Sequence, residues 1–349
     1  MPKRIALIPG DGIGVEVVRE AERVLATLVN RRRLPLDWTT FDWGAEKYLR
    51  EGVALPESAL ETLRRDFDAI LIGALGDPRV PSHQHAAEIL LGIRFGLDLY
   101  VNQRPVKLLD ARLCPLKGIA EKDVNFVVFR ENTEGAYAGV GGNFKRDTPD
   151  EVAVQEDVNT RKGVERILVH AFEYALRHGR KKVCMSDKAN AMPHAHGLWQ
   201  RTFAQVRRRY PQIDARHLYV DALAMEIVRN PSQFEIIVTC NLFGDILSDL
   251  AAALLGGLGL APSANLNPGK TSMFEPVHGS APDIAGKNRA NPMAAILTVG
   301  MMFDELGFPE ESSRIVKVVT EAIRQGITTP DLGGQVGTRE VGDWICTRL

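Results

Sequence analysis

Short apolar runs alternate with longer amphipathic stretches along most of this chain. Residues 4–8 (RIALI), 68–73 (DAILIG) and 234–239 (FEIIVT) are short and rich in β-branched residues, which predicts buried strands. A longer stretch with helical spacing of apolar residues predicts a helix over 14–29. The other expected strands are 125–129, 182–186 and 217–221, and the other expected helices are 160–178, 194–209, 245–255, 292–305 and 311–325. This alternation predicts an α/β fold with a parallel or mixed sheet.

One segment, 131–160, breaks the alternation. It is Gly-rich and polar with few core residues, which is typical of a hairpin arm or a long loop. At 349 residues the chain fits about two domains. No low-complexity linker separates two halves, so a second domain should be an insertion into the first.

Composition narrows the class of protein. Apolar content of 45% and charged content of 25% are ordinary for a globular protein. The net charge of −1 provides no global field for nucleic acid or a membrane surface. Four scattered cysteines without a C-x-x-C motif fit free thiols in a reducing compartment. The N-terminus lacks the apolar core of a secretion signal, so we expect a cytoplasmic protein.

Two aspartates four residues apart, Asp245 and Asp249 in NLFGDILSD, are the strongest chemical signal. Helical spacing puts them on one face, where two carboxylates repel each other unless a cation lies between them. Mg²⁺ or Mn²⁺ would bind such oxygen ligands, whereas a solvated acidic face is the alternative. The neighbouring Ile246, Leu247 and Leu250 predict a mostly buried helix, directly after the strand at 234–239. Ligands of α/β proteins bind at such strand-to-helix junctions.

Further candidates are basic or aromatic. Arg94, Arg104 and Arg130 flank apolar stretches, where they would form structural ion pairs or bind the carboxylates of an anionic substrate. Lys188 follows an expected strand and Tyr137 lies in the Gly-rich segment, so each is an acid–base candidate or an ordinary surface or packing residue.

Two glycine-containing segments suggest loops near a ligand. The segment 10–14 (GDGIG) lacks the third glycine of the dinucleotide fingerprint, since Val15 occupies that place. It predicts either a tight strand–helix turn or a loop that approaches substrate or cofactor. In the irregular segment 275–292, His278 could stack on adenine and Asp283 could bind ribose hydroxyls, which would favour NAD over NADP.

Taken together, these motifs resemble the β-decarboxylating dehydrogenases that act on isopropylmalate, isocitrate, homoisocitrate and tartrate or D-malate. The matching motifs extend over nearly the whole chain: IPGDGIG, LDLYVNQRPV, RENTEGAYAG, DKANAM, NLFGDILSDLAAALLGGLGLAPSAN and HGSAPDIAGKNRANP. The resemblance implies a two-domain isopropylmalate-dehydrogenase-like α/β fold with a central mixed sheet rather than a standard Rossmann fold. Residues 1–99 plus 252–349 would form a discontinuous large cofactor-binding domain. Residues 100–251 would form a small domain with a dimerisation arm, the dimer interface and the metal-site residues.

The resemblance also implies roles for individual residues, in a cleft between the domains of a homodimer with shared sites. Lys188 and Asp221 would reach over from the neighbouring subunit, and Tyr137 would donate a proton. The implied sets are Asp221, Asp245 and Asp249 for Mg²⁺ or Mn²⁺, Leu90, Leu91, Arg94, Arg104 and Arg130 for substrate, and His278, Gly279, Ser280, Ala281, Asp283 and Asn291 for NAD. NAD would take a hydride from C2, Lys188 the hydroxyl proton, and Tyr137 would protonate C3 after CO₂ leaves.

Residues before Arg94 select among the malates in this family. Glu88 and Leu90 stand where isocitrate enzymes carry Ser and Asn, which disfavours isocitrate and its third carboxylate. Leu90 and Leu91 match isopropylmalate enzymes, but Ala87 replaces their usual glutamate. The motif RENTEG and the segment 73–81 resemble the tartrate/D-malate branch instead. We therefore expect 3-isopropylmalate, within leucine biosynthesis, with tartrate or D-malate as the alternative and homoisocitrate behind both.

A catalytically silent regulatory subunit is the alternative from another class of function. Such subunits would be expected to lose metal or proton-transfer residues. All of them are present here: Tyr137, Lys188, Asp221, Asp245 and Asp249.

Overall fold

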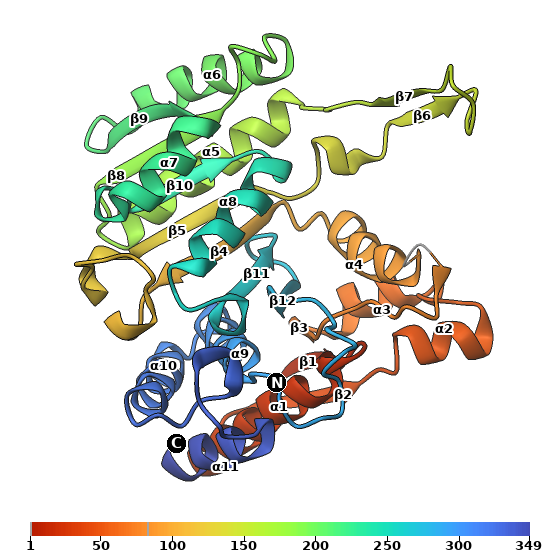
Figure 1. Cartoon of the computed structure of the whole chain (residues 1–349), viewed down its shortest axis with the longest axis vertical. Helices are drawn as coiled ribbons and strands as arrows, with labels where there is room; N and C mark the ends of the chain where they lie inside the picture. Colours follow the sequence, from red (N-terminus) through yellow and green to blue (C-terminus); the bar gives the residue numbers. More distant parts are fainter. Residues whose placement is uncertain (1, 82–83) are drawn as a thin grey trace. The chain divides into compact units, whose positions relative to one another are not determined.

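The computed structural model describes residues 2–81 and 84–349, which fold into two compact units (Figure 1). The first unit contains residues 1–99, 107–121 and 252–349. The second contains residues 100–106 and 122–251. Both mix strands and helices, so the predicted α/β class is confirmed. No helix in the described part of the chain is long and apolar enough to cross a membrane.

Five strands form the sheet of the first unit. Their order is β2 (Leu36–Thr40), β1 (Lys3–Ile8), β3 (Ala69–Ile72), β12 (Ser272–Pro276) and β11 (Pro262–Leu266). All neighbouring pairs are parallel except β11 and β12, which are antiparallel, so the sheet is mixed as expected. The helices are α1 (Ile13–Arg32), α2 (Ala45–Glu51), α3 (Ala59–Asp66), α4 (Gln84–Gly96), α9 (Met293–Glu305), α10 (Pro309–Arg324) and α11 (Thr338–Arg348).

The second unit has its own five strands, in the order β4 (Val101–Lys107), β5 (Asn125–Glu131), β10 (Ile236–Thr239), β8 (Lys182–Asp187) and β9 (Asp214–Tyr219). Its helices are α5 (Arg161–Arg177), α6 (Ala195–Val206), α7 (Val220–Arg229) and α8 (Asn241–Ala253). Strand β10 is buried along its whole length, since it lies between β5 and β8 and α5 packs on it. This explains its unbroken apolar sequence.

The Gly-rich segment forms a two-stranded antiparallel hairpin, β6 (Gly141–Phe144) and β7 (Val152–Gln155), which extends away from the rest of the second unit (Figure 1). Of the two structures expected for 131–160, the hairpin arm is therefore correct. Every residue of both strands is exposed, including Phe144 at 66%.

The division into units differs from our expectation in one segment. Residues 107–121, which we assigned to the small domain, belong to the first unit. Arg112 in this segment donates to the backbone oxygens of Ile323 and Arg324, and Glu121 forms an ion pair with Arg324. These contacts attach the segment to the end of α10, a pairing over some two hundred residues that local sequence pattern does not reveal.

Candidate active site

Helix α8 presents Asp245 and Asp249 on one face. Leu247 and Ala251, both fully buried, anchor the opposite face. The two carboxylate side chains are 34% and 51% exposed. Ile246 is 58% exposed, whereas Leu247 is buried and Leu250 is half-buried, so the expected burial of this helix fails at Ile246. An apolar side chain beside the carboxylates is left in solvent.

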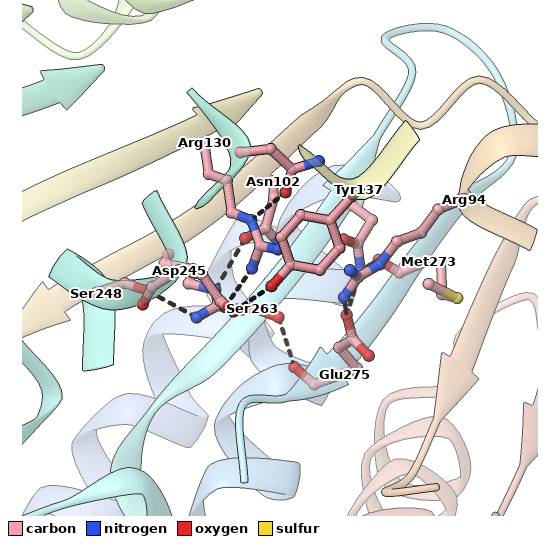
Figure 2. Close-up of polar contacts among 12 residues, drawn as sticks. Arg94, Asn102, Arg130, Tyr137, Asp245, Ser248, Ser263, Met273 and Glu275 are labelled. Atoms are coloured by element: carbon pink, nitrogen blue, oxygen red, sulfur yellow. Dashed lines mark hydrogen bonds and ion pairs between the residues drawn. The ribbon is translucent and has the colours of Figure 1, made fainter. Parts of the chain in front are cut away.

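Two arginines from neighbouring strands approach this face. Arg130 on β5 is 1% exposed and forms an ion pair with Asp245 (Figure 2). Its Nε donates to Asn241 Oδ1 over 2.8 Å. A Cβ at Gly244 would lie 2.5 Å from the Cβ of Arg130, so α8 can pass this close to the arginine only with glycine there.

Arg104 on β4 bridges the two carboxylates. Its Nη2 lies 3.2 Å from Asp245 Oδ1, and its Nη1 lies 3.2 Å from Asp249 Oδ1. Ser248 and Asn102 accept its remaining hydrogen bonds, at 2.7 and 2.8 Å. Because every guanidinium edge is held, the arginine is fixed in position. Sequence reasoning missed Asn102, Asn241 and Ser248 as partners, although all three lie inside the quoted motifs.

Tyr137 completes the group. Its hydroxyl donates to Asp245 Oδ2 over 2.8 Å, and its ring lies 5.1 Å from the guanidinium carbon of Arg130 (Figure 2). Burial raises the pKa of the phenol, and the hydrogen bond to Asp245 raises it further. The phenol therefore stays protonated at neutral pH and can serve as a proton donor.

The carboxylate pair fits a divalent cation in its donor chemistry. Burial raises the pKa of Asp249, the charge of Arg104 opposes this, and Asp245 raises it further. That mutual repulsion is what a cation would relieve. Within one chain, however, the described residues contain no group of three or more His, Cys, Asp or Glu side chains that could hold a metal. Asp245 and Asp249 thus provide two hard oxygen donors, the type of ligand that Mg²⁺ prefers.

Lys188 and Asp221 form a separate pair. Lys188 follows β8, Asp221 lies in the first turn of α7, and their Nζ and Oδ1 atoms are 2.5 Å apart. The hydrogen bond from Lys188 lowers the pKa of Asp221, which keeps this exposed carboxylate ionised. Asp221 joins no metal-binding cluster with Asp245 and Asp249 among the described residues of one chain.

The remaining substrate candidates belong to the first unit. Arg94 on α4 is 5% exposed, and its Nη2 donates to Glu275 Oε1 over 2.6 Å (Figure 2). Asn265 donates to the same oxygen over 2.8 Å. Leu91 is half-buried, while Leu90 packs against the apolar core of this unit. Glu275, which sequence reasoning missed, is signalled only by its place before PVHGS.

The expected cofactor loop and the GDGIG segment lie together in the first unit. GDGIG makes the tight turn from β1 to α1, and Ile13 N donates to Ser280 O over 2.8 Å. A Cβ at Gly12 would lie 2.1 Å from that oxygen, and its φ of 55° also favours glycine. GDGIG is therefore a tight strand–helix turn, and this turn also packs against the expected cofactor loop.

Among the cofactor candidates, His278 is half-buried, and burial lowers the pKa of its imidazole, so the ring is neutral. Gly279 and Asp283 are exposed, and Ser280 and Ala281 are half-exposed. Asn291 is buried; it donates to Asp331 and accepts from Met293 N at the start of α9.

Comparison with known proteins adds an independent finding. Residues 4–345 match the family model for isocitrate/isopropylmalate dehydrogenase. The chain is 45% identical to the 3-isopropylmalate dehydrogenase of Thermobifida fusca, over 99% of this chain and 97% of that one. It is also 45% identical to the probable tartrate dehydrogenase/decarboxylase of Bacillus subtilis, over the same shares. A crystal structure of isocitrate dehydrogenase from Methylococcus capsulatus matches with a TM-score of 0.89 at 38% identity, over 99% of both chains.

Proposed function

Because this chain belongs to the isocitrate/isopropylmalate dehydrogenase family, we propose that it oxidises and decarboxylates a 3-substituted malate with NAD and a divalent metal. The substrate we favour is 3-isopropylmalate, which would yield 4-methyl-2-oxopentanoate and CO₂ in leucine biosynthesis. One observation carries the proposal: the Asp245 carboxylate contacts two guanidinium groups and a protonated phenol. Such a group suits an anionic substrate that must also receive a proton.

The choice of malate rests on α4. Glu88 is exposed there, and a third substrate carboxylate beside it would be repelled. Leu91 offers an apolar surface to a branched substituent, which favours isopropylmalate. Tartrate or D-malate is the second candidate, because RENTEG and the similarity to the Bacillus subtilis protein favour that branch.

We assign Asp245 and Asp249 as metal ligands, with Asp221 from a second copy of the chain as the third. When bound, Mg²⁺ or Mn²⁺ would act as a Lewis acid on the C2 oxygen of the substrate. Arg94, Arg104 and Arg130 would bind the malate carboxylates as planar hydrogen-bond donors. Lys188, with Asp221 beside it, would take the hydroxyl proton, and Tyr137 would deliver a proton to C3.

The exposed apolar side chains of the second unit support a homodimer. Met225 and Val228 on α7 are 49% and 40% exposed, and Leu242 and Ile246 on α8 are 39% and 58% exposed. Large apolar groups gathered on two helices are typical of a protein interface. A second copy that covers α7 and α8 would also bring its own Asp221 close to the carboxylates of α8.

The decisive test is a substrate panel. NADH formation should be measured with 3-isopropylmalate, D-malate, tartrate, isocitrate and homoisocitrate, each with Mg²⁺ or Mn²⁺. We expect the highest kcat/KM for 3-isopropylmalate and none above background for a Lys188→Ala variant. Highest kcat/KM for tartrate or D-malate would select the second candidate, and activity with none of the five would refute the proposal.

A further inference from the structure

The backbone of Lys188 is held by a buried imidazole. Lys188 N donates to His196 Nδ1 over 2.7 Å, across the loop from β8 to α6. His196 is 1% exposed, and its Nε2 lies 3.2 Å from Asp157 Oδ2. Both ring nitrogens therefore have a partner, one of which is the amide of the proposed base.

These partners fix the tautomer of His196. A backbone N–H can only donate, so Nδ1 must carry no proton, and the proton of the neutral ring lies on Nε2, facing Asp157. Burial alone would raise the pKa of Asp157, but hydrogen bonds from His196 and Asn159 lower it below its ordinary value. Asp157 is thus an anion that keeps the imidazole in the accepting tautomer.

Asp157 is itself anchored. Asn159 Nδ2 donates to Asp157 Oδ2 over 2.8 Å, and Trp199 Nε1 donates to Asn159 Oδ1 over 2.7 Å. Trp199 is fully buried on α6, the helix that also carries His196. Hydrogen bonds thereby connect the Asp157 carboxylate, the His196 imidazole and the Lys188 amide to one helix, α6.

We propose that His196 is a positioning residue for Lys188, acting through the backbone amide that its Nδ1 accepts. This inference rests on the proposed role of Lys188 as the group that takes the substrate proton. The lysine side chain is a flexible chain of four methylene groups, so the position of its Nζ beside Asp221 depends on the position of the Lys188 backbone. A displacement of about 1 Å at a reacting group can cost about a hundredfold in rate.

The competing hypothesis is that His196 only packs in the core and donates a hydrogen bond to the Asp157 carboxylate. Two substitutions separate these roles, because an Asn amide occupies the place of Nδ1 and a Gln amide the place of Nε2. His196→Asn keeps an acceptor for Lys188 N and loses the contact to Asp157. His196→Gln keeps a donor for Asp157 and loses the acceptor for the amide.

The experiment measures kcat and KM for both variants beside the wild type and Lys188→Ala. We expect His196→Asn to keep kcat within about threefold, and His196→Gln to lower kcat by about tenfold to a hundredfold with little change in KM. Equal activity of the two variants, or a better Gln variant, would overturn the inference. An active Lys188→Ala protein would instead refute the proposed function.

His170 supplies matched controls. It is a second buried histidine of the same unit, 6% exposed on α5, and packs on Phe129. His170→Asn and His170→Gln should lower stability without separating in kcat. A readout independent of turnover is hydrogen exchange at the Lys188 amide, which should stay slow in His196→Asn and accelerate in His196→Gln. Unchanged exchange in the Gln variant would reject the positioning role even if no malate is a substrate.

Discussion

At the residue scale, Asp245 and Asp249 are the same amino acid in unequal surroundings. Asp245 contacts Arg104, Arg130 and Tyr137, whereas Asp249 lies at the more exposed end and contacts Arg104. Removing the charge of Asp245 would leave the buried Arg130 guanidinium without its carboxylate, which is costly in a low-dielectric site. Asp245 is therefore the more informative position to substitute.

Asp245→Asn should lower kcat/KM by about a hundredfold or more, because the variant would lose a proposed anionic metal ligand, and even outer partners of metal sites are worth about 10–100-fold. The metal concentration that gives half-maximal activity should rise in the same variant. Metal titrations of NADH formation test both effects, with Asp304→Asn, an exposed residue of α9, as the control. Full wild-type activity in excess EDTA would remove the metal from the mechanism.

His170 makes the fold sensitive to acid. Burial, with smaller effects from the charges of Arg177 and His178, lowers its pKa from 6.5 to about 4. Between these two pKa values the unfolded chain binds a proton at His170 that the folded chain does not bind. The contribution of the neutral His170 to the unfolding free energy is therefore fully present above pH 6.5 and is lost as the pH falls toward 4. The shift corresponds to about 3 kcal/mol.

His170→Leu should remove most of this loss. Between about pH 7.5 and about pH 4.5 the variant should lose about 2–3 kcal/mol less unfolding free energy than the wild type. Urea unfolding at the two pH values measures it. Leucine also removes a ring nitrogen, Nε2, that has no hydrogen-bond partner among the residues that the structure describes. Equal losses in both proteins would show that other groups control acid unfolding.

At the element scale, the sequence predicts the strands that are apolar because they are buried. It does not predict a strand whose apolar pattern is interrupted by polar residues of the candidate site. Strands β5 and β10 are apolar runs because both of their faces are buried, and both were expected. Strand β4 was missed, because two polar residues interrupt its apolar pattern: Arg104, which contacts Ser248 and Asp249, and Asn102, which accepts a hydrogen bond from Arg104. The expected strand 217–221 ends at Tyr219 instead, because Asp221 favours the first turn of α7.

The loop after β12 should decide the cofactor. The family resemblance implies that Asp283 and the next residue, Ile284, match the positions at which NADP-dependent enzymes carry a lysine and a tyrosine, and Asp283 is exposed. Asp283→Lys combined with Ile284→Tyr should shift the ratio of kcat/KM values toward NADP by about tenfold or more, which is about 1.4 kcal/mol of binding. Asp283→Asn removes only the repulsion between the Asp283 carboxylate and the 2′-phosphate of NADP, so it should shift the ratio less. A wild type that uses both cofactors equally would contradict the role of Asp283.

At the scale of the whole molecule, local pattern identifies motifs but not their assembly. The attachment of 107–121 to the end of α10 depends on contacts remote in sequence. Ile246, expected to be buried, is 58% exposed in the single chain, and the proposed homodimer would cover it. Where sequence predicts burial and one chain leaves exposure, a second copy is the simplest cover.

Shared active sites can be tested by complementation. If Lys188 and Asp221 serve the site of the neighbouring subunit, Lys188→Ala and Asp245→Asn subunits are each inactive as homodimers but should complement each other. In a heterodimer one site receives both lesions and the other receives neither, so up to half of the wild-type activity should return. If each site were built within one chain, every site would keep one lesion and mixing would restore nothing.

Co-expression with two tags and double purification isolates the heterodimer. A verified heterodimer without activity would refute the shared site, yet it would leave Asp245 as a metal ligand and Asp283 as the cofactor determinant to be judged by their own variants.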